Sequence, residues 1–302
     1  MSDLESPQEK KSGLIAGFGA YFFWGFLPIY WHQIKEASAL EIASFRMAGS
    51  AIFLGLILLG TRRFNELKLI LSQTKTILIL VATSLLISIN WLLFIWAINH
   101  GHMVESSLGY FINPLVNILL GSLILRERLR PWQLFSTMLA ACGVCYLTWV
   151  VGKLPLIALV LAITFSLYGL LRKIVTAGPL VGLAVETFLI GPFTLVYLVY
   201  IYCIKRVDFF SYSSVTIVGL ALAGAITALP LVAFAYAAKR LNYSTLGFLQ
   251  YIAPTCGFLI ATLIYHEPVH YRQFIGFSLI WIALIIYSID AAWLIRIKSI
   301  KT

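Results

Sequence analysis

The sequence predicts an all-helical integral membrane protein with ten transmembrane helices and both termini in the cytoplasm. The chain has 302 residues, of which 61% are apolar and 11% charged, whereas soluble domains carry about 25% charged residues. Apolar stretches recur along the chain, each near the roughly 20 residues that a helix needs to cross the hydrocarbon. Lys and Arg gather on alternate sides of these stretches. A soluble fold could not cover so much apolar surface, so lipid must replace the polar coat.

The first half of the chain begins with a polar tail, residues 1–12, for which we predict a cytoplasmic location. Five spans follow, and short polar segments separate them. Lys35 follows the first span, Arg62 and Arg63 follow the second, and Arg126 follows the fourth. The predicted spans cover residues 13–34, 40–60, 76–98, 103–125 and 131–150.

The second half has the same organisation, and it ends in a cytoplasmic tail, residues 296–302. Its predicted spans cover residues 154–171, 180–203, 215–237, 243–265 and 271–294. We therefore expect two five-helix units, residues 13–150 and 151–295.

The basic residues predict the orientation of these spans. Sixteen Lys and Arg residues lie on the side of both termini and five on the other side, and Arg46 lies inside a span. Cytoplasmic loops carry the excess of Lys and Arg, which places both termini in the cytoplasm. The basic residues behind the net charge of +10 are scattered between apolar runs, whereas nucleic-acid binding needs them gathered in one patch. We therefore expect the protein to have the lipid bilayer as its partner and to bind no nucleic acid.

The two halves carry related residues at a spacing of 140. Pro114 and Glu127 of the first half correspond to Pro254 and Glu267 of the second, and Arg46 corresponds to Glu186. Five spans per half is an odd number, so the second half must enter the membrane from the opposite face. Inverted repeats of this kind are typical of secondary transporters.

Two long segments resemble a known family. They read SLGYFINP at residues 107–114 with ERL at 127–129, and STLGFLQYIAP at 244–254 with EP at 267–268. Trp24-Gly25 and Tyr168-Gly169 match as well. Together they resemble the RarD-type branch of the EamA transporters, in the drug/metabolite transporter superfamily. The resemblance implies a ten-helix inverted-repeat carrier of the bacterial inner membrane. His32 departs from the lysine-like residue expected in relatives.

Arg46 and Glu186 are the first candidate substrate-binding residues. A charge inside a span costs about 2.5–3.5 kcal/mol on insertion scales, so it normally faces a water-filled cavity or a partner. We expect Arg46 to hold an anionic group of the substrate and Glu186 to take a cation or a proton. The alternatives are snorkelling to the interface or pairing within the protein.

Polar and aromatic residues inside the spans complete the predicted substrate site. Amides need hydrogen-bond partners in lipid, which another helix, water or cargo can supply. Pro114 and Pro254 predict helix bends, because proline removes a backbone hydrogen bond. Aromatic rings would bind a partly apolar cargo, although they also form belts at the lipid interface. The further substrate-binding candidates are Asn90, Tyr110, Asn113, Tyr168, Gln250 and Tyr251.

Glu127 and Glu267 lie at helix ends beside arginines. Such charges usually cap a helix or form a salt bridge, and the repeat symmetry suggests that each also gates its own side. His100, His102 and Glu105 lie around one turn, but they form no closed ligand set, and we predict no metal and no cofactor.

The predicted function is secondary transport of a small metabolite or drug-like molecule by alternating access, in the direction of export and with protons as the candidate counter-ion. No Walker motif occurs, so ATP is not the driver within this chain. The alternatives are a membrane enzyme acting on a lipid or carrier-linked substrate, or a non-transporting scaffold. A homodimer is left open, because every span has apolar faces.

Overall fold

The computed structural model describes residues 7–100, 102–152, 155–204, 207–266 and 271–300, and this part of the chain contains helices and no strand. The first half holds α1 (Pro7–Gln33), α2 (Ala39–Thr61), α3 (Phe64–Leu71), α4 (Thr74–Asn99), α5 (Met103–Leu123) and α6 (Pro131–Val151). The second half holds α7 (Leu156–Ile174), α8 (Pro179–Cys203), the 3-10 turn η1 (Phe209–Ser211), α9 (Ser214–Arg240), α10 (Tyr243–Gln250), α11 (Ile252–Leu263) and α12 (Tyr271–Ile300).

Local sequence signals start several of these helices. Ser38 and Glu41 form a reciprocal capping box at the start of α2, and Ser213 accepts a hydrogen bond from the Thr216 backbone N–H at the start of α9. Pro131 and Pro179 occupy the first positions of α6 and α8, where the missing N–H costs no helical bond. The polar segments between spans therefore both separate the helices and cap them.

Nine segments of the described chain are long and apolar enough to cross a membrane, and α10 with α11 counts as one of them. In α12 the apolar stretch is shorter, Phe274–Asp290. Large apolar side chains such as Ile52, Phe193 and Trp149 lie on the surface, with 63%, 77% and 75% of each exposed. Because this exposed apolar surface would be unstable in water, the helical bundle is that of an integral membrane protein. Ten spans and the side of the termini remain predictions.

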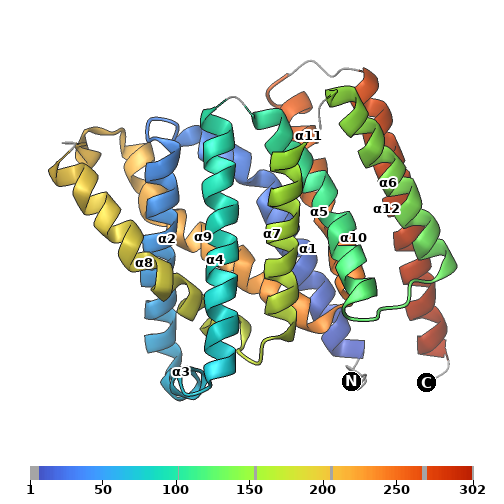
Figure 1. Ribbon diagram of the computed structural model, residues 1–302, viewed down its shortest axis with the longest axis horizontal. Coiled ribbons are helices and arrows are strands. Elements are labelled where there is room, and N and C mark those ends of the chain that lie inside the picture. The colour runs from blue at the N-terminus through green and yellow to red at the C-terminus, as the bar shows by residue number, and fades with distance from the viewer. Residues whose placement is uncertain (1–6, 101, 153–154, 205–206, 267–270, 301–302) are drawn as a thin grey trace.

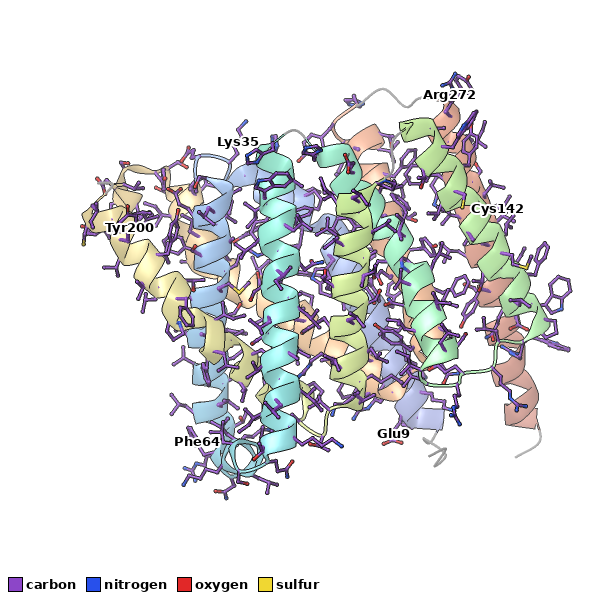
Figure 2. All side chains as sticks on the ribbon, in the orientation of Figure 1. Glu9, Lys35, Phe64, Cys142, Tyr200 and Arg272 are labelled. Atoms are coloured by element: carbon purple, nitrogen blue, oxygen red, sulfur yellow. The ribbon has the colours of Figure 1, made fainter. Side chains whose placement is uncertain are left out.

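Figure 1 shows the first turn of α1, the short α3 and the last turn of α12 at one end of the bundle, which we name the α3 end. In Figure 2, Glu9 and Phe64 lie at the α3 end, and Lys35 and Arg272 lie at the opposite end, which we name the Lys35 end. The predicted spans leave residues 61–75 as a connecting segment, and the structure shows the short helix α3 within it.

Most of the close helix packing joins one half of the chain to the other. α2 packs on α8 and α9, α1 on α9 and α11, and α5 on α7 and α10. α6 and α12 pair along one edge of the bundle (Figure 1). The two halves therefore share one core rather than forming separate domains.

Small residues allow the closest of these contacts. A Cβ atom on Gly224 of α9 would collide with the backbone of Gly49 in α2, and Ser50 Oγ donates a hydrogen bond of 2.9 Å to the Gly224 carbonyl. Close backbone approach at small residues drives helix association in lipid, where apolar side chains gain little by leaving their surroundings.

The helices at the two repeat prolines differ. α5 runs through Pro114 without interruption, whereas the second-half helix is divided at Tyr251 into α10 and α11. Pro254 has no N–H to bond the Gln250 carbonyl one turn before it, which explains a break at this point. The order Leu-Gly-aromatic, which occurs in both halves, also lies two residues further from proline in the second half, since Gly109 precedes Pro114 by five residues and Gly247 precedes Pro254 by seven.

Candidate functional site

Arg46 and Glu186 occupy equivalent positions in the two halves. Each lies seven residues after the first residue of its helix, α2 or α8. Because α2 begins at the Lys35 end and α8 begins at the α3 end (Figure 1), the two charges enter the bundle from opposite sides. Their surroundings differ completely.

Aromatic rings surround the guanidinium of Arg46. It lies over the ring of Trp31 at 4.8 Å and over the ring of Trp91 at 4.9 Å from the centroids. Its Nε donates a hydrogen bond of 3.0 Å to Thr227 Oγ1. Four helices, α1, α2, α4 and α9, thus contribute to the group that we name the Arg46 cage: Arg46, Trp31, Trp91 and Thr227.

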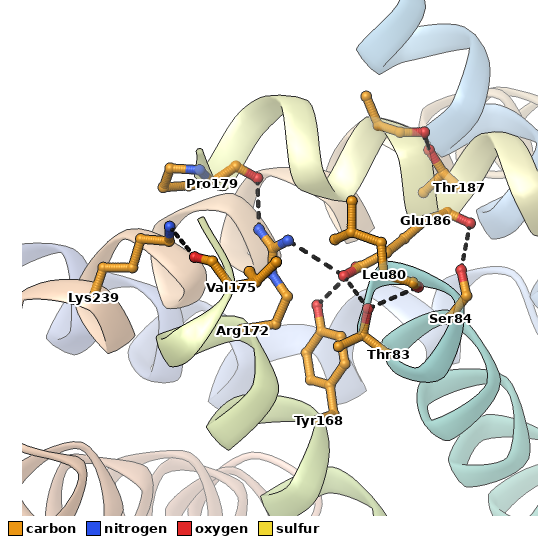
Figure 3. A network of polar contacts seen from close by, with 11 residues as sticks. Leu80, Thr83, Ser84, Tyr168, Arg172, Val175, Pro179, Glu186, Thr187 and Lys239 are labelled. Atoms are coloured by element: carbon orange, nitrogen blue, oxygen red, sulfur yellow. Dashed lines mark hydrogen bonds and ion pairs between the residues drawn. The ribbon is translucent and has the colours of Figure 1, made fainter. Parts of the chain in front are cut away.

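Glu186 lies in a buried ion pair. Arg172 Nη1 is 3.3 Å from its Oε1, and the two side chains are 0% and 1% exposed. Thr83 Oγ1 donates to Oε1 at 2.6 Å and the Tyr168 hydroxyl donates to Oε2 at 3.3 Å. Figure 3 shows these three side chains converging on the carboxylate. Glu186 therefore pairs within the protein, one of the two alternatives that the sequence left open.

Sequence reasoning missed Arg172, which it counted with the loop charges at the α3 end. Arg172 also donates to the Pro179 carbonyl at 2.9 Å, and a Cβ atom on Gly182 would collide with its guanidinium. A signal was present, because Arg172 follows Tyr168 by four residues and residues at this spacing share one face of a helix.

A small cavity separates the Arg46 cage from the ion pair. Its volume is about 10 Å³, which is close to the room that one water needs. Its lining includes Trp91 of the Arg46 cage together with Tyr168 and Glu186 of the ion-pair network. The two predicted charges therefore approach the same region of the core from opposite ends.

The predicted amides Asn90, Asn113 and Gln250 bond to neighbouring helices, and Asn117, for which we expect a role in helix–helix contact, bonds with one of them. Asn90 Nδ2 donates to the Leu161 carbonyl at 2.8 Å and to Thr164 Oγ1 at 2.9 Å. Asn113 Nδ2 donates to the Ala162 carbonyl at 2.7 Å. Asn117 Nδ2 donates to Gln250 Oε1 at 2.8 Å, which joins α5 to α10. These amides hold α4, α5, α7 and α10 together in this conformation, and their predicted role toward cargo stays a prediction.

The three predicted tyrosines lie in different surroundings. Tyr110 is 48% exposed and packs edge-on against Phe94. Tyr168 is fully buried and stacks on Phe234. Tyr251 is also fully buried at the break between α10 and α11, and its hydroxyl has no hydrogen-bond partner within the described chain. Tyr110 is therefore partly exposed, whereas Tyr168 and Tyr251 belong to the buried core.

Glu127 caps α10 from outside that helix. Its carboxylate accepts hydrogen bonds from the Tyr243 N–H at 2.6 Å, the Ser244 N–H at 2.9 Å and Ser244 Oγ at 2.9 Å. A negative charge at a helix N-terminus is stabilising, and this contact ties the α5–α6 connection to the second half. Glu267, its repeat equivalent, lies outside the described residues.

The helix ends at the α3 end are tied by two lysines. Lys173 Nζ, at the end of α7, donates to the Ala238 and Leu241 carbonyls at 3.0 and 2.5 Å. Lys239 Nζ, at the end of α9, donates to the Val175 carbonyl at 2.7 Å (Figure 3). Each lysine thus bonds carbonyls at the other helix's C-terminus, where cations are favoured. We name these two residues the lysine latch.

Comparison with known proteins identifies the class. The sequence model of the EamA-like transporter family matches residues 11–149 and matches a second time at residues 153–289. The chain belongs to the EamA-like transporter family. Within it, this transporter is 41% identical over 292 residues to protein RarD of Salmonella typhimurium, covering 96% of this chain and 99% of that one. It is 41% identical over 281 residues to an uncharacterized transporter of Pseudomonas aeruginosa, covering 93% and 94%.

A solved crystal structure shares the fold of this EamA-like transporter. It aligns with a TM-score of 0.71 over 93% of this chain and 99% of its own, at 18% identity. The relatives are named transporters and not enzymes. The chain is thus a RarD-type transporter of the drug/metabolite transporter superfamily and a multi-pass membrane protein, and the enzyme alternative is set aside.

Proposed function

We propose that this transporter is a secondary carrier that exports a small metabolite or drug-like molecule across the bacterial inner membrane by alternating access. The proposal includes ten spans in two inverted units, with both termini in the cytoplasm. Halves that exchange roles across a central site are the usual architecture of such carriers. The α3 end is then the cytoplasmic end.

The lysine latch is the observation that carries this proposal. It ties α7 to α9 by hydrogen bonds at the α3 end. The positions 140 residues earlier hold Gln33 and Asn99, neither of which carries a charge, so the Lys35 end cannot form the same latch. This difference between the two halves in the sequence supports a carrier whose α3 end is held by the latch and must release it during transport. Export requires this end to open so that cargo can enter.

A second contact at the same end offers a direct test. Thr76 Oγ1 of α4 lies 2.8 Å from Thr176 Oγ1, just after α7. Two cysteines at these positions are close enough for a disulfide, whose sulfur atoms are about 2.05 Å apart. The bridge would hold the first half against the second at the α3 end.

The experiment measures transport by purified protein in liposomes after the four native cysteines, Cys142, Cys145, Cys203 and Cys256, are replaced by alanine. Exchange of labelled compounds is screened with amino acids, nucleosides and chloramphenicol. Chloramphenicol is included because a Pseudomonas aeruginosa relative, 26% identical, is named chloramphenicol-sensitive protein RarD. The pair Thr76→Cys/Thr176→Cys is compared with Ser213→Cys/Thr216→Cys, whose hydroxyls are 3.1 Å apart within one helix start.

We expect saturable exchange that oxidation stops in the Thr76/Thr176 pair and that reduction restores, while the Ser213/Thr216 pair stays active in both states. Inside-out vesicles with an imposed gradient give the direction of flux. Full activity of the oxidised Thr76/Thr176 pair would contradict opening at the α3 end. Absence of exchange for every compound by folded protein would favour the scaffold alternative.

A further inference from the structure

Arg46 is a cation in the membrane interior whose hydrogen-bonding groups are mostly unused. An arginine side chain has five N–H donors, and in the Arg46 cage only Nε has an acceptor, Thr227 Oγ1. In the part of the chain that the structure describes, no carboxylate lies within ion-pair distance of Arg46. The two Nη groups are therefore available as a planar fork.

The acidic side chains nearest to it along the helices are engaged elsewhere. Glu41, one and a half turns earlier in α2, accepts hydrogen bonds from the Ser38 N–H and the Tyr212 hydroxyl. Glu186, the repeat equivalent, is paired with Arg172. The titratable groups that interact with Arg46 are the hydroxyls of Tyr30 and Tyr110, and neither is a carboxylate.

The cage holds the guanidinium in place without neutralising it. Trp31 and Trp91 contact it through their ring faces, and such cation–π contacts are attractive. They leave the charge and the Nη edge unpaired, because a ring face offers no acceptor in the guanidinium plane. A ligand that approaches this edge meets two parallel donors, the geometry that binds carboxylate and phosphate bidentately.

The charge and the rings together indicate the class of ligand. One cation balances one negative charge, which a carboxylate carries, whereas a phosphate monoester carries about −1.5 to −2 at neutral pH. Next to the fork, Trp31 and Trp91 present aromatic surface, and the Tyr110 side chain also interacts with Arg46. A further aromatic cluster, Trp24 with Phe165 and Phe234, belongs to the core of the bundle.

We propose that Arg46 binds the carboxylate of the transported molecule, and that this molecule is an organic monoanion with a flat apolar body. The inference rests on the proposed carrier function, since it names the substrate class of that site. The carboxylate meets the Nη edge of Arg46, and the apolar body lies against the rings of Trp31, Trp91 and Tyr110.

Binding and transport are measured separately. Binding to the purified protein in detergent is measured by calorimetry with three aromatic carboxylates, phenylacetate, indole acetate and naphthoate. The matching amides, phenethylamine and phenyl phosphate serve as comparison compounds. The variants are Arg46→Lys, which keeps the charge but not the fork, Arg46→Met, and Thr227→Val. The matched control is Arg63→Lys, because Arg63 is an exposed arginine at the α3 end with 51% of its side chain accessible.

We expect at least one carboxylate to bind, and its amide to bind about 10- to 100-fold more weakly, the range for a hydrogen bond to a charged group. Arg46→Met should abolish this preference, Arg46→Lys should reduce it, and Arg63→Lys should leave it unchanged. If Arg46→Met does not fold, Arg46→Lys and Thr227→Val carry the test.

Three results would overturn the inference: no binding by any carboxylate up to its solubility limit, equal binding of acid and amide, or tighter binding of phenyl phosphate. Transport then separates the two proposals. An Arg46-dependent preference for the acid without any flux would support Arg46 as a carboxylate-binding residue and contradict the carrier function. Saturable flux of another compound, fully retained in the Arg46→Met variant, would support the carrier function and contradict the inference about Arg46.

Discussion

The buried ion pair between Arg172 and Glu186 makes a quantitative prediction. Removing one partner of a buried pair costs about 3–5 kcal/mol, because the other charge is left without compensation. In Arg172→Met the Glu186 carboxylate keeps the hydroxyl donors of Thr83 and Tyr168, so we expect about 3 kcal/mol, the lower end of that range. In Glu186→Gln the Arg172 guanidinium keeps the Pro179 carbonyl and can donate to the neutral amide oxygen, but its charge is left without a counter-charge in the core, and we expect a loss of similar size.

The double variant Arg172→Met/Glu186→Gln removes both charges and should cost less than the sum of the single variants, with a coupling energy of about 2–3 kcal/mol. The assay is reversible unfolding in mixed micelles, followed by far-ultraviolet circular dichroism. The control pair is Arg63 and Glu66, which are 3.6 Å apart with 51% and 35% of their side chains exposed; exposed pairs couple by about 0.2–1 kcal/mol. Equal coupling in the two pairs would refute the burial argument.

Three further changes test other features. Gly224→Ala should destabilise the protein by about 1–3 kcal/mol, because its Cβ meets the backbone of α2, whereas Gly19→Ala, with open space around it, should be neutral or slightly stabilising in the same unfolding assay. Glu127→Ala should cost about 1–2 kcal/mol by uncapping α10, and unchanged hydrogen exchange of the first α10 amides would contradict this. Hydrogen bonds lower the pKa of the exposed Glu36 carboxyl below its ordinary 4.5. The bond from the Ser213 N–H has the largest effect, and those from the Thr216 and Ser213 hydroxyls add to it. Its stabilisation is therefore complete above the unfolded pKa and is lost as the pH falls below about 4.5 through the folded value. Glu36→Gln should flatten the stability profile in that range, and a profile identical to that of the native chain would argue against this contact.

Glu186 also carries the prediction of proton coupling. If its carboxylate takes the driving proton, Glu186→Gln should lose transport driven by a pH gradient and keep exchange of cargo across the membrane. This pattern differs from simple destabilisation, which would lower both activities in parallel. Retention of pH-driven transport by the variant would place the proton site elsewhere.

The sequence by itself determined the helical membrane class, the approximate spans and the equivalence of Arg46 with Glu186. Composition decides the class because an apolar surface of this size is stable only in lipid. Span positions follow because about 20 residues cross the hydrocarbon, and charges mark their ends. The equivalence of Arg46 and Glu186 follows from the 140-residue repeat, and the structure places both at the same depth in their helices.

The tertiary structure alone decided what these residues touch. Arg172 became the partner of Glu186, Trp31 and Trp91 enclosed Arg46, and the helix broke at Tyr251 but not beside Pro114. The physical reason is the uniform apolarity of the spans. In water a polar stripe shows which face of a helix is outside, whereas in lipid both faces are apolar. Partner helices are then selected by small residues and single polar contacts, which involve residues far apart in the sequence.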